Sequence, residues 1–86
     1  MPELSRFLGI EITMYFNDHM PPHFHAEYNG QEAIFEISTL KKLEGSLPAR
    51  VLGYVVEWAT LHQVELQANW DSLHTDGKFN KIQPLV

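Results

Sequence analysis

Residues 23–36 read HFHAEYNGQEAIFE, two alternating segments joined by one Asn-Gly pair. Asn-Gly favours a two-residue type I′ turn, because both turn positions need positive φ. Such a turn sets Phe24 opposite Phe35 and His25 opposite Ile34. The apolar face of this hairpin then carries Phe24, Ala26, Ala33, Phe35 and Ile37. The polar face carries His23, His25, Glu27, Glu32 and Glu36.

The segments before this hairpin predict one more strand and a loop. Residues 10–16 alternate between apolar and polar side chains, which is typical of a half-buried strand. Residues 17–22 must form a loop, because Pro21 and Pro22 donate no backbone hydrogen bond. Residues 1–9 look like an opening segment that packs on the core, with a short helical turn as one option, and Gly9 ends it.

After the hairpin, the pattern changes from strand to helix. Residues 40–44 predict a short edge strand ended by Gly45, and Ser46 and Pro48 suit the N-cap and first turn of a helix. Helical periodicity follows at Leu52, Val55, Ala59, His62, Leu66, Asn69 or Trp70, and Leu73. It predicts one helix over about 47–75, or two that meet near His62-Gln63. The tail, residues 78–86, is expected to dock across the sheet.

These elements predict an α+β fold, a three- to four-stranded antiparallel β-meander packed on one long helix or two consecutive C-terminal helices. The chain has 86 residues, which predicts a single domain over residues 1–86. The net charge of −5 disfavours nucleic-acid binding by this chain alone, because an acidic surface repels phosphates. No apolar run approaches the roughly 20 residues of a membrane span, and residues 1–4 lack the charged-then-apolar form of a signal peptide, so we expect neither. With no cysteine, it excludes disulfides and thiolate metal sites, and we expect a cytoplasmic protein.

Histidines concentrate just before and within the hairpin. His19, His23 and His25 fall within seven residues, beside Asp18. His23 and His25 are two apart and therefore share one face of a strand. Such a pair can bind one divalent transition metal, because imidazole and carboxylate donors suit zinc, iron, copper or nickel. The third ligand would be Asp18 or His19 from the loop, or Glu36 across the strand pair.

The same cluster suits general acid–base chemistry. Histidine titrates near neutral pH, so Asp18, His19, His23 and His25 are candidate catalytic residues. An RNA-directed hydrolysis would also need a cation near the phosphate. The nearby cations of the sequence are Lys41, Lys42 and Arg50.

A structural interpretation competes with both functions, because a histidine opposite a glutamate is also an ordinary cross-strand pair. His62 lies on the apolar helical stripe, where a buried histidine usually makes one hydrogen bond. The alternative is that His62 points at the sheet and joins the cluster as a metal ligand. His74 is interpreted as a helix-end or solvent-exposed residue. Trp58 and Trp70 suit the core or an interface, and their region or an exposed strand edge would support a homodimer.

Several segments resemble a small bacterial family of unknown function with the signature YFNDHxPPHFHA. They are YFNDHMPPHFHA (15–26), LEGSLP (43–48), EWA (57–59), LH (61–62) and NW (69–70). The resemblance implies one half of a toxin–antitoxin-like two-gene module, with a small protein partner encoded nearby. It implies no catalytic residue and no cofactor. Lys41-Lys42 departs from the glycine- or acid-containing turn of many relatives.

Three functions therefore stay open. The first is an interacting component of a toxin–antitoxin-like pair, since an acidic chain would be steered to a basic partner. The second is a small histidine-dependent enzyme, and the third is a metal-binding module without catalysis.

Overall fold

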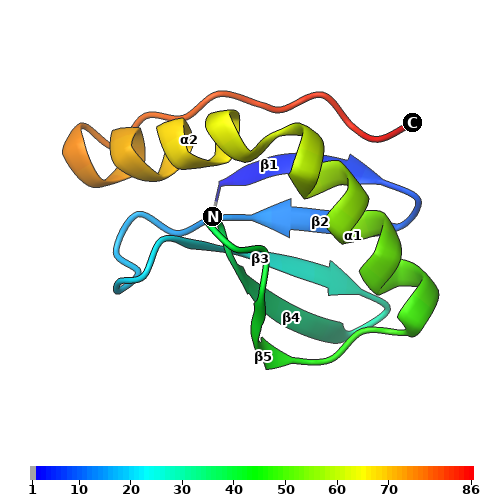
Figure 1. Ribbon diagram of the computed structural model, residues 1–86. Helices are drawn as coiled ribbons and strands as arrows, with labels where there is room; N and C mark the ends of the chain where they lie inside the picture. The colour runs from blue at the N-terminus through cyan, green and yellow to red at the C-terminus, as the bar shows by residue number, and fades with distance from the viewer. Residues whose placement is uncertain (1) are drawn as a thin grey trace.

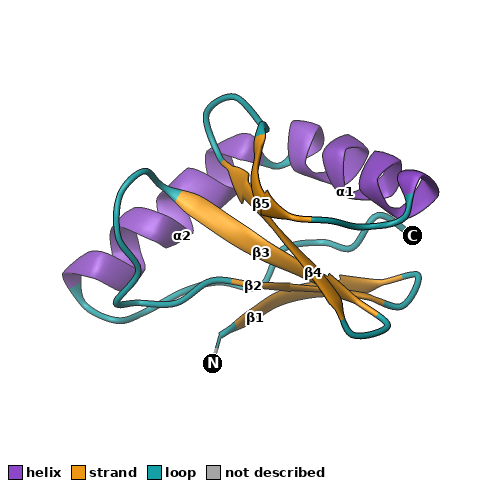
Figure 2. Ribbon diagram, turned by 90° about the horizontal axis from the view of Figure 1, so that it is seen from below, coloured by secondary structure: helices purple, strands orange, loops and turns teal. Residues whose placement is uncertain are grey.

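The computed structural model describes residues 2–86 and shows an antiparallel sheet with two helices on one of its faces (Figure 1, Figure 2). The strands follow one another in chain order across the sheet, each antiparallel to the next. They are β1 (Glu3–Phe7), β2 (Ile10–Thr13), β3 (His23–Tyr28), β4 (Gln31–Glu36) and β5 (Lys42–Gly45). The predicted α+β meander is confirmed, but the predicted three to four strands are wrong, because the described residues form five.

The β3–β4 hairpin has the predicted register. Phe24 pairs with Phe35 and His25 pairs with Ile34. The turn residues Asn29 and Gly30 both have positive φ, 48° and 80°, as a type I′ turn requires. The Phe24 and Phe35 rings stack with centroids 5.5 Å apart, so this hairpin supplies the centre of the core.

The N-terminal segment differs from the prediction. Part of the predicted opening segment is strand β1, and its first residue, Met1, lies outside the described residues. Leu8 and Gly9 have φ values of 52° and 78°, so they form a tight turn that pairs Phe7 with Ile10. The strand predicted over residues 10–16 ends at Thr13, and Phe16 is 63% exposed in the following loop.

The C-terminal half contains two helices that meet at His62. They are α1 (Ala49–Leu61) and α2 (Gln63–Thr75), so the two-helix alternative is confirmed. The predicted N-cap is wrong: Pro48 occupies that position, and the backbone N–H of Ser46 instead donates to Glu32 O at 3.1 Å. Because Ser46 is bonded to the sheet, it extends the contact of β5 with β4.

The tail closes one edge of the sheet. The backbone N–H of Ile82 donates to Leu4 O at 2.8 Å, and Trp58 Nε1 donates to Gln83 O at 2.8 Å. The tail therefore lies along β1 and beside the helices, rather than across the sheet (Figure 1). Trp58 and Trp70 are 0% and 4% exposed, so both rings belong to the core, as one of the two sequence interpretations predicts, and the homodimer stays a prediction.

No helix among residues 2–86 has the length and apolar character needed to cross a bilayer.

Candidate functional site

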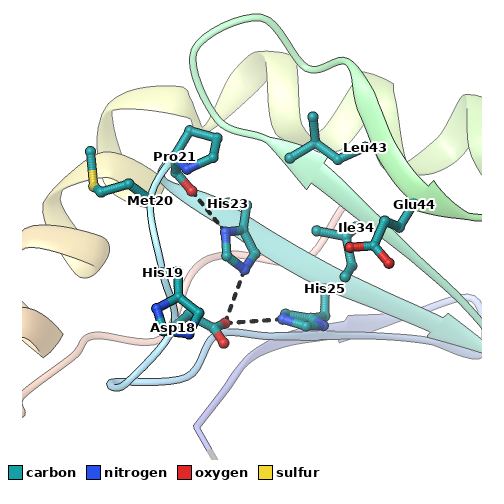
Figure 3. A pocket seen from close by; sticks show the side chains of 9 residues that line it. All are labelled: Asp18, His19, Met20, Pro21, His23, His25, Ile34, Leu43 and Glu44. Atoms are coloured by element: carbon teal, nitrogen blue, oxygen red, sulfur yellow. Dashed lines mark hydrogen bonds and ion pairs between the residues drawn. The ribbon is translucent and has the colours of Figure 1, made fainter.

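The loop between β2 and β3 brings Asp18 against the first residues of β3. Asp18 Oδ2 lies 3.1 Å from His23 Nε2 and 3.1 Å from His25 Nε2 (Figure 3). The two imidazoles share one face of β3, as their spacing predicts. Their side chains are each 11% exposed, although they lie on the face opposite the main core. One carboxylate oxygen and two ring nitrogens thus converge at a nearly buried point.

The outer nitrogen of each imidazole has its own partner. His23 Nδ1 lies 2.8 Å from Pro21 O, and His25 Nδ1 lies 3.3 Å from Glu32 Oε2. A carbonyl or carboxylate oxygen only accepts, so each ring donates to this partner when its proton is on Nδ1, and to Asp18 when its proton is on Nε2. In a neutral ring protonated at Nδ1, Nε2 has its lone pair pointing at Asp18, which is the tautomer that a metal ion at this point would require. Contacts of this kind fix the tautomer of histidines that bind metals in proteins.

The lone pairs of the two Nε2 atoms and of Asp18 Oδ2 determine which kind of cation the cluster can bind. Two unprotonated Nε2 atoms facing a carboxylate oxygen repel it, unless positive charge lies between them. Protonating both rings would place two cations with ring centroids 5.3 Å apart in a nearly buried site. One divalent cation neutralises the same three atoms without that repulsion. The donor set therefore fits a transition metal, as two imidazoles and a carboxylate do.

Helix α2 holds this loop through His74. The His74 ring stacks on Trp70 with centroids 4.1 Å apart, and the Trp70 ring lies 5.2 Å from that of His23. His74 Nε2 lies 3.1 Å from the backbone oxygen of Asp18. The helix therefore positions both the aspartate and one imidazole. The sequence interpretation of His74 missed this contact, because 56 residues separate the two partners.

A pocket of about 290 Å³ opens beside the cluster. Figure 3 shows it between the loop and β5. It is lined by Asp18, His19, Met20, Pro21, His23, His25, Ile34, Leu43 and Glu44. None of these residues is a lysine or an arginine, so the pocket lacks the cation that phosphate hydrolysis would need.

The other predicted site residues lie outside the cluster. Among residues 2–86, Asp18, His23 and His25 are the only group of three or more ligand residues close enough to share one ion. His19 lines the pocket without joining that group. Glu36 accepts a hydrogen bond from Thr39 at 2.7 Å. His62 contacts Glu65, and its ring lies 5.4 Å from Trp58.

The shifted pKa values belong to a charged group on β1 and β2, away from the pocket. A hydrogen bond from Arg6 lowers the pKa of Glu3, with an N–O distance of 2.7 Å. A hydrogen bond with Glu3 raises the pKa of Glu11. The same carboxylates raise the pKa of Arg6, with Glu3 contributing most.

The fold and the site define a small α+β protein with an aspartate and two histidines gathered under one loop. Residues 9–71 match the family model described as Domain of unknown function (DUF4160), and the chain belongs to this family. The match includes the three clustered residues and ends before His74. No curated protein and no solved structure matches the chain. The family description names no activity, so the toxin–antitoxin interpretation stays a prediction.

Proposed function

We propose that the protein binds one divalent transition-metal ion through Asp18, His23 and His25. The observation that carries this proposal is the shared contact, in which one carboxylate oxygen lies 3.1 Å from Nε2 of both imidazoles. The partners at each Nδ1 support it, because the contacts with Pro21 and Glu32 hold the two rings with both Nε2 atoms facing Asp18 Oδ2. A structural histidine pair needs no such arrangement, since one hydrogen bond would satisfy each ring.

The acid–base alternative has less support. The same three residues can pass protons, but the pocket lining contains no lysine or arginine to hold an RNA phosphate. The chain also carries a net charge of −5, which repels a polyanion. The lack of lysine and arginine in the pocket and the negative net charge both favour metal binding, because acidic surroundings attract a cation.

The proposal is tested with protein purified without a histidine tag and freed of metal by chelation. Titration calorimetry with Zn²⁺, Co²⁺ and Ni²⁺ is expected to show one site per chain for at least one of these ions. His23→Ala and His25→Ala are each expected to weaken binding by more than about 100-fold, the upper figure for losing an outer-shell partner, since each removes one direct ligand of three. Circular dichroism of each variant checks that the fold is intact.

His62→Ala is the matched control. It removes the same side chain from a histidine that lies outside the cluster and contacts Glu65. The affinity of this variant should equal that of the unchanged protein. If the cluster variants bind as tightly as the control, or the unchanged protein binds no ion stoichiometrically, the proposed metal function is wrong.

A second candidate function is the interacting half of a toxin–antitoxin-like pair. Exposed apolar side chains favour it, because they suit a protein interface. Phe16 and Met20 on the loop are 63% and 74% exposed, and Leu61 and Val64 at the helix junction are 66% and 84% exposed. Co-expression with the neighbouring gene product tests it: a complex that survives gel filtration supports this role, and two separate peaks contradict it.

A further inference from the structure

The proposed metal centre has three protein ligands and borders a pocket. Among the described residues, no other His, Asp or Glu atom joins the group formed by Asp18, His23 and His25. A structural zinc site is closed by four protein ligands, whereas a reactive site has three and leaves one position to an outside molecule. The three ligands here also line the pocket of about 290 Å³, so an outside molecule can reach the ion.

The pocket wall opposite the loop comes from β4 and β5. His25 pairs with Ile34, and Ile34 pairs with Glu44, so these three residues form one row across the sheet. Figure 3 shows Glu44 and Leu43 on the side of the pocket away from Asp18. Two strand spacings separate His25 from Glu44, which is roughly 10 Å.

The lining favours one chemical class of ligand. Its apolar members are Met20, Pro21, Ile34 and Leu43. Its acidic members are Asp18 and Glu44, and a third acidic residue, Glu32, contacts Nδ1 of His25. A carboxylate that is not a ligand repels an incoming anion but has little effect on a neutral donor.

We propose that the open side of this metal centre binds small uncharged donor molecules and that Glu44 selects them against anions. This inference rests on the proposed metal function. It assigns the pocket as the ligand site and Glu44 as a residue that sets specificity without binding the ion. The selection is electrostatic, so it weakens as salt screens the carboxylate.

The test uses the cobalt-loaded full chain, because the visible absorption of Co²⁺ reports changes in its ligands. Imidazole serves as the neutral probe and azide as the anionic probe. Each is expected to change the spectrum in a saturable way, with one molecule bound per cobalt. Glu44→Gln changes the charge at this position by one unit and Glu44→Lys changes it by two, at roughly 10 Å from the azide. The affinity for azide is therefore expected to rise about twofold and about fourfold. The affinity for imidazole should stay unchanged in both variants.

Glu57→Lys is the matched control. It makes the same change in net charge from an exposed position on α1 that does not line the pocket. Its azide affinity should equal that of the unchanged protein, and added salt should remove the difference between Glu44→Lys and this control.

The outcomes separate this inference from the proposed function. If none of Zn²⁺, Co²⁺ and Ni²⁺ binds stoichiometrically, both are wrong, and if Zn²⁺ or Ni²⁺ binds but cobalt does not, the metal function stands and this inference is wrong. If cobalt binds but neither probe changes its spectrum, the metal function stands and the open ligand site is wrong. If both probes respond and the Glu44 variants match Glu57→Lys, the assigned role of Glu44 is wrong.

Discussion

Gly45 ends β5, where it pairs with Ala33 of β4, and an added side chain there would collide with the sheet. Its φ is +80°, and a Cβ atom would lie 2.0 Å from Glu32 O and 2.9 Å from Ala33 Cα. Both are backbone atoms, so neither can rotate away from the new atom. We therefore expect Gly45→Ala to push β5 away from β4.

Gly30→Ala is the control that isolates this collision. Gly30 also has a φ of +80°, but nothing lies within 4 Å of an added Cβ. Both variants carry the strain of a left-handed alanine, about 1 kcal/mol. Only Gly45→Ala also displaces Glu32 O, which accepts the hydrogen bond from Ser46 at 3.1 Å. If that bond and one neighbouring β4–β5 bond are lost at about 1 kcal/mol each, the excess destabilisation is about 2 kcal/mol.

Urea unfolding followed by tryptophan fluorescence measures the difference, because Trp58 and Trp70 are buried in the folded chain. The free energy of unfolding of Gly45→Ala should be about 2 kcal/mol below that of Gly30→Ala. Equal values for the two variants would refute the reasoning, because they would show that β5 absorbs the new atom without leaving β4.

Three further predictions concern the helix contact, the tail and the charged group. His74→Ala should weaken metal binding about tenfold in calorimetry, because the bond that holds the Asp18 backbone is lost; an unchanged affinity would show that the loop holds itself. Asn69→Ala should lower the free energy of unfolding by about 2 kcal/mol, because its amide makes two bonds to the tail, at 2.9 and 2.8 Å; a loss typical of a surface substitution would contradict this. In a carboxyl-carbon NMR titration, Glu11 should titrate at higher pH than Glu3, because a guanidinium lowers the pKa of Glu3 and Glu3 raises that of Glu11. Equal titration midpoints for Glu3 and Glu11 would contradict this prediction. Because the pKa of Glu3 is lowered in the folded state, its stabilising contribution is present above pH 4.5, its unperturbed pKa. That contribution is lost as the pH falls through the lowered pKa of the folded state.

The hairpin was predictable from sequence because its signal is local. The Asn29-Gly30 pair predicts a type I′ turn, and this turn sets the residue pairs along β3 and β4. The β1–β2 turn gave no comparable signal, because Leu8 rarely adopts the positive φ that it has here. The first strand was missed for that reason, although its apolar residues were expected to pack on the core.

Only those features of the site that depend on residues close together in the sequence could be predicted. The spacing of His23 and His25 places both imidazoles on one face, and the prolines limit where the loop can go. The partner of His25 is Glu32, a diagonal neighbour, whereas Glu36 was expected from direct pairing with His23. Diagonal contacts depend on the twist of the sheet, which a pairing diagram does not contain.

The family match excludes two segments that pack against the rest of the sheet and helices. Strand β1 and the tail both lie outside residues 9–71, yet Leu4 and Ile82 join them by a backbone hydrogen bond. A fragment trimmed to the matched residues would leave the outer edge of β2 without its neighbour. Bare strand edges recruit other chains, so such a fragment is expected to self-associate. Fragments for study should therefore retain both flanking segments.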